Sequence, residues 1–316
     1  MSKNFAITGV SGYIAQRHLK AIKDTGNKLV AAIDPNDSAG ILDGYFDNVS
    51  FFTEFERFDR HIEKLRRRDK GAEIDYVTIC SPNHLHDAHA RFAMRIGADV
   101  ICEKPLVLNP WNIDALQELE EEYGKRIYTI LQLRVHPSII AFKKELEKSK
   151  SKSKKEIELT YITSRGPWYL VSWKGKLEKS GGLATNIGIH FFDMLMWLFG
   201  KVEHSEVHFS NPMKTAGYIE LENAKVKWLL SIDSNDLPED ISSKGQRTYR
   251  SITVDDKEIE FSGGFADLHT VVYEKTLAGA GFGLETARPS IELVHNLRNL
   301  KPIGFNENSH PLAKNI

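Results

Sequence analysis

The chain has 316 residues, of which 41% are hydrophobic and 27% are charged, and its formal net charge is −1. This balance is typical of a globular protein and argues against nucleic-acid binding, which calls for a basic surface. The length suits two domains, each large enough to form a core without disulfides or a structural metal.

The two cysteines, Cys80 and Cys102, lie in apolar runs, which indicates reduced and buried thiols. The N-terminus shows no signal-peptide pattern. The longest apolar run, Phe191 to Phe199, is interrupted by Asp193 and is shorter than the roughly 20 residues that span a bilayer. We therefore expect a cytoplasmic protein with no membrane partner.

Short apolar strands alternate with amphipathic helices in the first part of the chain. The predicted strands are Asn4–Thr8, Lys28–Asp34, Asp75–Cys80, Asp99–Cys102 and Arg126–Leu133, and the predicted helices are Tyr13–Asp24, Phe55–Lys70, His84–Ile96 and Ile113–Tyr123. This alternation predicts an α/β Rossmann domain over residues 1–134, a doubly wound parallel sheet whose strands all end at one edge. Ligands of such sheets bind at that edge.

The rhythm changes after residue 134. The predicted helices are His136–Ser149, Gly188–Leu198 and Ala287–Leu300, and the predicted strands are Ile157–Ser164, Ser205–Ser210, Thr215–Glu222, Ala224–Ser231, Tyr249–Val254 and Lys257–Ser262. They indicate a second α+β domain, residues 135–316, with an open and mainly antiparallel sheet. The basic run Lys143–Lys155 is interpreted as a solvated helix end. A sheet with one bare face favours an oligomer.

A glycine turn joins the first strand to the first helix. Its sequence from Gly9 to Ala15 is G-x-x-G-x-x-A, with Gly9, Ser11, Gly12, Tyr13 and Ile14 as candidate cofactor contacts. Glycines allow a sharp turn, and a helix N-terminus attracts a diphosphate. Asp34, at the end of the second strand, can accept hydrogen bonds from a ribose and would repel a 2′-phosphate, which favours NAD. A plain turn and a turn aspartate are the alternatives.

Two further motifs follow strands of this sheet. Ser81, Pro82 and Asn83, with His86 one turn later, follow the third strand and are further cofactor candidates, although Asn83 could simply cap a helix. Glu103 and Lys104 follow the fourth strand. A lysine near a nicotinamide cation would lose its proton readily, whereas an ordinary Glu-Lys pair is surface.

The second domain contains one glycine-bracketed helix start, from Gly181 to Asp193, with the pattern G-G-x(5)-G-x-H-x-x-D. His190 and Asp193 share a helical face. A core histidine bonded to an aspartate is the alternative interpretation.

These motifs, in this order and across nearly the whole chain, resemble the glucose–fructose oxidoreductase / inositol dehydrogenase (Gfo/Idh/MocA) superfamily. Within it the chain is most similar to bacterial UDP-N-acetylglucosaminuronic acid 3-dehydrogenases, which act in the synthesis of diacetamido-mannuronic acid sugars for lipopolysaccharide O-antigen. The narrower resemblance rests on the segments Arg165–Gly175 and Ser234–Pro238.

The resemblance implies an NAD-dependent enzyme in which Lys104 and His190 are the catalytic pair, with either as the base. It also implies a cis Lys104–Pro105 bond, for which a proline in an ordinary tight turn is the alternative. Oxidation would convert the sugar 3-hydroxyl to a ketone. Glu103, Lys104, Trp168 and Trp173 are then further cofactor contacts, and Arg165, Thr185 and Asn186 join Lys104 and His190 at the substrate, with Arg134 and Lys174 as weaker candidates. Related enzymes are usually homotetramers, and some reoxidise NADH with 2-oxoglutarate, which this sequence leaves open. No metal is expected.

Three alternatives remain. Another dehydrogenase of the superfamily could act on a free sugar, an inositol or a different nucleotide sugar. A non-catalytic NAD-binding regulator would not need both Lys104 and His190. A zinc enzyme could use His84, His86 and His89, but no cysteine stands at ligand spacing from them.

Overall fold

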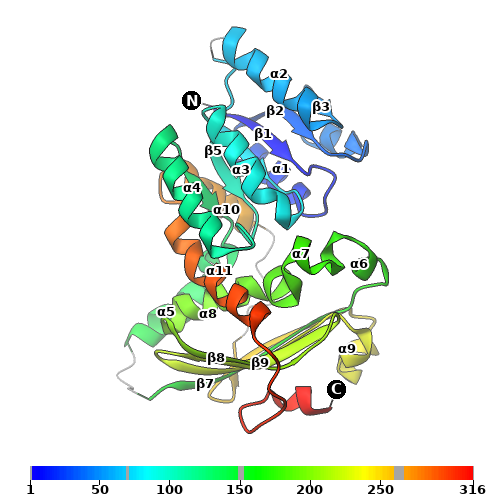
Figure 1. Cartoon of the computed structure of the whole chain (residues 1–316), viewed down its shortest axis with the longest axis vertical. Coiled ribbons are helices and arrows are strands. Elements are labelled where there is room, and N and C mark those ends of the chain that lie inside the picture. The colour runs from blue at the N-terminus through cyan, green and yellow to red at the C-terminus, as the bar shows by residue number, and fades with distance from the viewer. Residues whose placement is uncertain (1, 69–70, 149–152, 260–266, 316) are drawn as a thin grey trace. The chain divides into compact units, whose positions relative to one another are not determined.

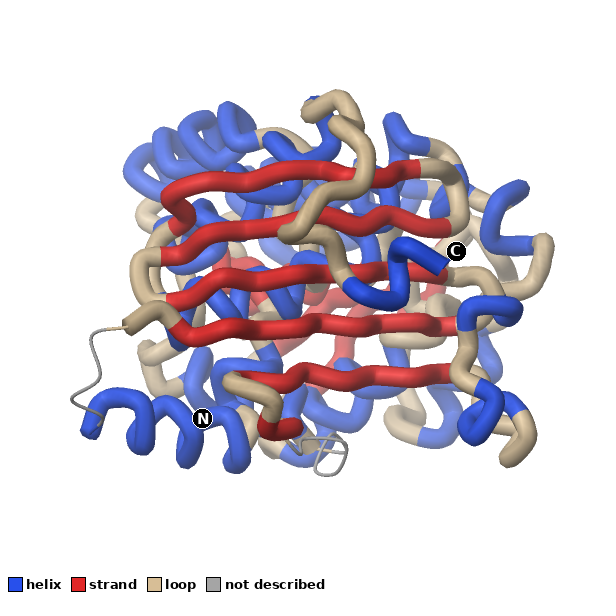
Figure 2. The backbone as a smooth tube through the Cα atoms, turned by 90° about the horizontal axis from the view of Figure 1, so that it is seen from below, coloured by secondary structure: helices blue, strands red, loops and turns tan. Residues whose placement is uncertain are grey.

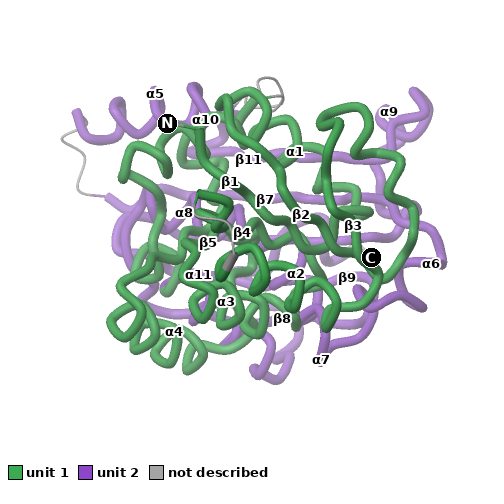
Figure 3. The backbone as a smooth tube through the Cα atoms, turned by 90° about the horizontal axis from the view of Figure 1, so that it is seen from above, with its two compact units in different colours: residues 1–135, 266–288 green, residues 136–265, 289–316 purple. Residues whose placement is uncertain are grey.

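The computed structural model describes residues 2–68, 71–148, 153–259 and 267–315, and the chain divides into two compact units (Figures 1 and 3). Unit 1 comprises residues 1–135 and 266–288, and unit 2 comprises residues 136–265 and 289–316. The split expected from the sequence kept residues 135–316 together. It differs because helix α10 (Leu268–Leu277) packs against α1 (Ala15–Asp24) and so belongs to the first unit.

Unit 1 is built on a parallel sheet with the strand order β3-β2-β1-β4-β5-β6, which confirms the Rossmann fold. Apolar, uninterrupted strands such as β1 and β4 are buried on both faces, as parallel strands are. The strands are β1 (Asn4–Thr8), β2 (Lys28–Ile33), β3 (Ser50–Phe52), β4 (Tyr76–Ile79), β5 (Asp99–Cys102) and β6 (Ile127–Thr129). The longer helices besides α1 and α10 are α2 (Phe55–Arg68), α3 (His86–Arg95) and α4 (Pro110–Tyr123).

Helices cover both faces of this sheet. Phe55 of α2 stacks on His89 of α3 with ring centroids 5.1 Å apart, which places α2 and α3 together. The connections from β1 to β2 and from β4 to β5 run in opposite directions across the sheet, so right-handed crossovers put α1 and α3 on opposite faces. All strands therefore end at one edge, where the predicted motifs lie.

Unit 2 is built on a second sheet with the order β12-β11-β7-β10-β9-β8, in which only the pair β7 and β10 is parallel within the described residues. This confirms the α+β expectation. The strands are β7 (Lys155–Thr163), β8 (Val202–Ser210), β9 (Lys214–Leu221), β10 (Ala224–Ser231), β11 (Thr248–Val254) and β12 (Lys257–Glu258). The helices include α5 (Pro137–Lys148), α6 (Trp168–Val171), α7 (Leu177–Ser180), α8 (Ile189–Phe199), α9 (Glu239–Ser242) and α11 (Leu284–Asn299), of which α11 begins in unit 1. Residues 69–70, 149 and 260–262 of the predicted elements lie outside the described residues.

The two faces of this second sheet differ. Trp228 of β10 packs against Phe192 of α8, with ring centroids 5.5 Å apart, so α8 covers one face. On the other face Leu229 and Ala216 contact Ala313, near the end of the chain. Figure 2 shows the segment leading to the C-terminus crossing these strands. Part of the face expected to be bare is thus covered by the chain itself.

By length and composition, the helical run Leu177–Phe199 could cross a membrane, although the apolar run expected from the sequence was shorter. Its apolar window is 83% buried inside the unit. Such burial is typical of a core helix, and here the run supplies the core beneath the sheet.

Candidate active site

The glycine turn follows β1 at the sheet edge. Gly9 has φ +77°, and a Cβ there would lie 2.6 Å from the main chain of Cys80 and Ser81, so only glycine lets β1 end against the end of β4. The turn closes with a hydrogen bond from Gly12 N to Gly9 O at 3.1 Å. Helix α1 then starts without a side-chain cap or an acidic residue in its first turn. Its N-terminal amides therefore suit a diphosphate.

Asp34 lies directly after β2 and is buried. Its Oδ2 accepts a hydrogen bond from Ser11 N at 3.0 Å, which ties it to the glycine turn. Its Oδ1 accepts from the main-chain N and the side-chain Nδ2 of Asn36 at 2.9 and 3.0 Å. The carboxylate thus stabilises its own loop, as expected of a turn aspartate. It also lies beside the predicted cofactor turn, as expected of a residue that binds the ribose.

The Ser81–Pro82–Asn83 turn follows β4. His86 is buried below it, with Nε2 2.8 Å from Ser81 O and Nδ1 2.7 Å from Pro105 O. Burial lowers the pKa of His86, while its contacts with the two carbonyl groups oppose that shift. His86 therefore joins the two motif-bearing turns rather than reaching outward itself.

Of the histidines considered for zinc, His86 and His89 have other partners. His89 Nδ1 lies 2.9 Å from Ser81 Oγ, and its ring stacks on Phe55. Burial lowers the pKa of His89 to about 4, so the ring is neutral in the fold. In the described part of the chain, the group with metal-ligand geometry is a different one, His18, Glu103 and His269.

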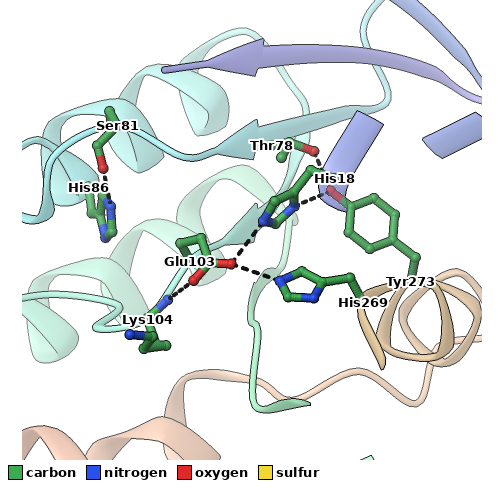
Figure 4. A network of polar contacts seen from close by, with 8 residues as sticks. All are labelled: His18, Thr78, Ser81, His86, Glu103, Lys104, His269 and Tyr273. Carbon is green, nitrogen blue, oxygen red and sulfur yellow. Dashed lines mark hydrogen bonds and ion pairs between the residues drawn. The ribbon is translucent and has the colours of Figure 1, made fainter. Parts of the chain in front are cut away.

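Glu103 and Lys104 follow β5, and the Lys104–Pro105 bond is cis, as the resemblance implied. The Glu103 carboxylate points inward (Figure 4). Its Oε1 lies 2.9 Å from His18 Nε2 and 3.0 Å from His269 Nε2, and its Oε2 accepts from Lys104 N at 3.1 Å. Burial raises the pKa of Glu103, but the hydrogen bonds from the two histidines outweigh it and hold that pKa well below its usual range. This carboxylate is therefore an internal anion.

Unit 1 thus gathers its predicted residues on the segments that directly follow β1, β2, β4 and β5. These are Gly9, Ser11, Gly12, Tyr13, Ile14, Asp34, Ser81, Pro82, Asn83, His86, Glu103 and Lys104. Tyr13 is 84% exposed, in contrast to the buried Asp34. The remaining candidates belong to unit 2 and are described within it.

The glycine-bracketed segment of unit 2 forms a π-helical turn, Ala184–Gly188, ahead of α8. π-Helical turns are rare in proteins, and those that occur are often found at functional sites. Asn186 Nδ2 donates to Tyr169 OH at 2.6 Å. Among the described residues, Thr185 Oγ1 is a buried oxygen with no hydrogen-bond partner. The turn therefore presents one fixed amide and one unsatisfied hydroxyl.

His190 lies in the first turn of α8. A Cβ at Gly188 would lie 2.6 Å from Leu230 of β10, so glycine lets the start of α8 sit close on the sheet. His190 is half-buried and meets the ring of Tyr161 edge-on at 6.1 Å, whereas Asp193 is buried. His190 is thus the more accessible of the two residues that the helical spacing paired.

Arg165 follows β7 and is exposed, with its main-chain N bonded to Ile232 O at 3.0 Å. Trp168 is 50% exposed. Lys174 Nζ lies 5.4 Å from the Trp168 ring and 4.7 Å from the Trp173 ring, so this segment carries two aromatic faces with a cation above them.

A cavity of about 380 Å³ opens within unit 2 beside this segment. Its lining includes Tyr169, Lys174, the Gly181–Gly182 turn, Asn211 and Arg298. Burial lowers the pKa of Arg298. Two cations beside glycine main chain make the cavity suited to an anionic ligand.

Sequence reasoning missed the residues that α10 contributes. His269 and Tyr273 reach Glu103 and His18, and no prediction placed a helix there. The signal was present, because Leu268, Val272 and Thr276 recur every four residues and are buried. Tyr169, which anchors Asn186, was also missed.

A family model described as an oxidoreductase family, NAD-binding Rossmann fold, matches residues 3–131, and the model of its C-terminal α/β domain matches residues 154–241. The structure is similar to a WlbA (WbpB) dehydrogenase from Thermus thermophilus, with a TM-score of 0.93 and 54% identity over 98% of this chain and 99% of that one. That protein was solved with NAD and α-ketoglutarate, and also with NAD and UDP-GlcNAcA.

A WlbA dehydrogenase from Bordetella pertussis shares the fold, with a TM-score of 0.74 and 18% identity over 94% of this chain and 95% of that one. Inositol 2-dehydrogenase from Rhizobium meliloti is 29% identical over 205 residues. That match spans 64% of this chain and 56% of the relative. The two matched domains and the full-length similarity identify the chain as a member of the Gfo/Idh/MocA oxidoreductase family, with an NAD-binding Rossmann domain.

Proposed function

We propose that this protein oxidises the 3-hydroxyl of UDP-N-acetyl-D-glucosaminuronic acid to a ketone, in the synthesis of diacetamido-mannuronic acid sugars for O-antigen. The observation that carries the proposal is the 54% identity, over essentially the full chain, with a dehydrogenase solved with NAD and UDP-GlcNAcA. Lys104 after β5 and His190 at the start of α8 provide the acid–base groups that such a reaction needs.

The residues of unit 1 fit NAD. The glycine turn and the uncapped start of α1 suit the diphosphate, and the buried Asp34 beside Ser11 suits an unphosphorylated ribose. When bound, NAD accepts a hydride from the sugar carbon.

The protein supplies the proton transfer. Lys104 or His190 removes the proton of the 3-hydroxyl, and the electron pair left on oxygen forms the carbonyl as the hydride departs. A neutral lysine or a neutral imidazole can each accept this proton. The carbon is oxidised by two electrons, and the proton and hydride account for both hydrogens lost.

Groups of unit 2 suit the remaining parts of the substrate. We assign the sugar carboxylate to Arg165, whose exposed guanidinium can bind it with two hydrogen bonds. Thr185 and Asn186 supply a hydroxyl and an amide for the sugar, and Trp168 and Trp173 supply flat apolar walls for the nicotinamide. The cavity at Lys174 and Arg298 suits the diphosphate.

We further propose that NADH is reoxidised by 2-oxoglutarate, which takes up a hydride and a proton to become 2-hydroxyglutarate. Support comes from the Thermus thermophilus relative, which was solved with this acid. We also propose a homotetramer, to be checked by light scattering.

Mass spectrometry of the products tests the proposal. The enzyme, NAD and 2-oxoglutarate are incubated with UDP-N-acetylglucosaminuronic acid, with UDP-N-acetylglucosamine, which lacks the carboxylate, or with UDP-glucuronic acid, which lacks the N-acetyl group. We expect oxidation of the first substrate, and a substrate deuterated at C3 should pass its label to NADH and 2-hydroxyglutarate, whereas one deuterated at C4 should pass none. Retention of the C3 label would overturn the assignment of position.

Arg165→Ala should weaken catalysis with the uronic acid more than any residual oxidation of UDP-N-acetylglucosamine. Lys176→Ala, an exposed cation of the same segment, is the matched control and should change neither. An equal loss with both sugars would show that Arg165 does not read the carboxylate.

Inositol or a free sugar is the second candidate substrate, because Inositol 2-dehydrogenase is among the relatives. Oxidation of myo-inositol, with no turnover of any UDP-sugar, would favour it.

A further inference from the structure

The environment of Glu103 is unlike that of a surface glutamate. Its side chain is buried, and its two oxygens face three N–H donors from His18, His269 and Lys104 at 2.9 to 3.1 Å (Figure 4). His18 comes from α1, directly behind the glycine turn, and His269 comes from α10. One carboxylate therefore links both helices to the turn that carries Lys104.

The proton positions in this cluster follow from its contacts. A carboxylate only accepts, so His18 and His269 each present Nε2–H to Oε1. His18 Nδ1 then accepts from Tyr273 OH at 2.8 Å, and Tyr273 OH accepts from Thr78 Oγ1 at 2.8 Å. In this series of hydrogen bonds, from Thr78 through Tyr273 and His18 to Glu103, each donor has an acceptor when His18 is neutral. The hydrogen bonds of the series therefore need no added ion.

Burial also sets the charge state of several groups around Glu103. The titratable groups that face Glu103 are His18, Cys80, His86, Cys102, His269 and Tyr273. Burial lowers the pKa of His18 and raises the pKa of Cys80, Cys102 and Tyr273, which keeps these four groups uncharged near neutral pH. Glu103 is thus an anion next in sequence to the Lys104 amine.

A buried carboxylate is costly, and a pair of apolar residues would often fill such a space at lower cost. Oε2 accepts the main-chain N–H of Lys104, so the carboxylate fixes the backbone from which the lysine side chain extends.

We propose that Glu103, held by His18 and His269, is a positioning residue for Lys104: it fixes the lysine backbone and its negative charge favours the protonated amine. This inference rests on the proposed function, in which Lys104 takes part in proton transfer. The Glu103 side chain is buried, so its carboxylate faces away from solvent.

Glu103→Gln separates charge from shape. The glutamine oxygen can still accept from both histidines, but its NH2 group then faces the N–H of Lys104 and cannot bond to it. We expect kcat to fall roughly 10- to 100-fold, as small misplacements of a catalytic group do, with KM and NAD affinity nearly unchanged. The pH–rate limb governed by Lys104 should move to lower pH, because loss of a nearby anion disfavours the ammonium form.

Glu120→Gln is the matched control. Glu120 is also buried in unit 1 and also accepts a main-chain N–H, that of Ile127 at 2.6 Å, besides Arg126 at 3.2 Å. Its hydrogen bonds are made at the start of β6 and not at the motif turns, so this variant should lower stability and leave the pH–rate profile in place. An unmoved profile in Glu103→Gln, or an equal shift in Glu120→Gln, would overturn the proposal.

His269 provides the rescue test. His269→Gln keeps an N–H that can reach Oε1 and should retain most of kcat, whereas His269→Phe removes the donor and should resemble Glu103→Gln. Equal activities of the two variants would overturn the role of His269. Elemental analysis of the purified holoenzyme checks the metal alternative, because the three ligand atoms lie within 4.8 Å of one another. One equivalent of zinc or iron would replace the hydrogen-bonded network and overturn it.

Hydrogen exchange separates this inference from the proposed substrate. In the NAD-bound protein without sugar, the amide of Lys104 should exchange faster in Glu103→Gln than in wild type or Glu120→Gln. If this occurs while wild type oxidises no nucleotide sugar, the proposed function fails and the positioning network stands. If the amide exchanges equally in all three proteins, the network fails whatever the substrate.

Discussion

Replacing Gly9 with alanine tests why the cofactor turn begins with glycine. Two costs arise. A left-handed backbone, here φ +77°, costs an L-residue roughly 1–2 kcal/mol. The new Cβ would also lie 2.6 Å from main-chain atoms of Cys80 and Ser81, and overpacking of this kind costs roughly 1–3 kcal/mol. Since main-chain atoms cannot rotate away, we expect the free energy of unfolding to fall by roughly 2–5 kcal/mol.

Gly26→Ala is the matched control for the backbone cost. Gly26 follows α1 in the same unit with φ +72°, and a Cβ there would meet nothing within 4 Å. This variant should lose only about 1–2 kcal/mol. Urea unfolding followed by circular dichroism measures both variants, and titration with NAD measures whether the turn still binds. Gly9→Ala should lose NAD affinity, whereas Gly26→Ala should keep it.

An equal loss of stability in Gly9→Ala and Gly26→Ala would refute this reasoning. If both alanine variants lose the same stability, the contact with the end of β4 is not what demands glycine at position 9. If Gly9→Ala is destabilised but binds NAD normally, the turn is a packing device and the cofactor role of this residue is wrong.

Three other predictions concern catalysis, cofactor choice and pH. Lys104→Ala and His190→Ala should each lower turnover by about 10²- to 10⁴-fold with NAD affinity near wild type; wild-type turnover in either would remove that residue from the mechanism. Asp34→Ala should weaken NAD and narrow its lead over NADP in steady-state assays, since the carboxylate that repels a 2′-phosphate is gone, and an unchanged preference would contradict this. His89 has a pKa of about 4 in the fold and about 6.5 when unfolded, so its stabilisation is complete above pH 6.5 and is lost as pH falls towards 4. His89→Phe should reduce the slope of unfolding free energy with pH in this window by about one proton, or roughly 1.4 kcal/mol per pH unit; an unchanged slope would show that His89 does not titrate there.

The regular elements of unit 1 could be predicted because their signals are local. Continuous apolar strands and helices of period 3.6 predicted β1, β2, β4 and β5 with the helices that follow. Strand β3 was missed because three residues, Ser50 to Phe52, carry too short a pattern, and it exists through pairing with β2. Helix α10 was missed although its period is visible, because the change to strands before it suggested that the first domain had ended.

The candidate site also contains features that the sequence predicts and features that it does not. Turns that follow strands, such as Gly9–Gly12 and Lys104–Pro105, could be placed at one sheet edge from topology alone. Glu103 could not, since it was grouped with Lys104 as a surface or cofactor residue and its partner His269 stands 166 positions later. No local pattern reports a contact over that separation.

A physical rule nevertheless connects the two. Glu103 follows a buried parallel strand and is itself buried, so its carboxylate needs hydrogen-bond donors besides the N–H of Lys104. His18 was the available clue, because a histidine on the buried face of α1, beside Leu19 and Ile22, also needs a polar partner. When the topology brings together two elements that each carry a buried polar residue, a hydrogen bond between the two residues accounts for the burial of both. Once the burial of Glu103 and His18 is known, the fold therefore predicts a hydrogen-bonded network beneath the Lys104 turn. Its third member, His269, lies on α10, a helix that packs on α1.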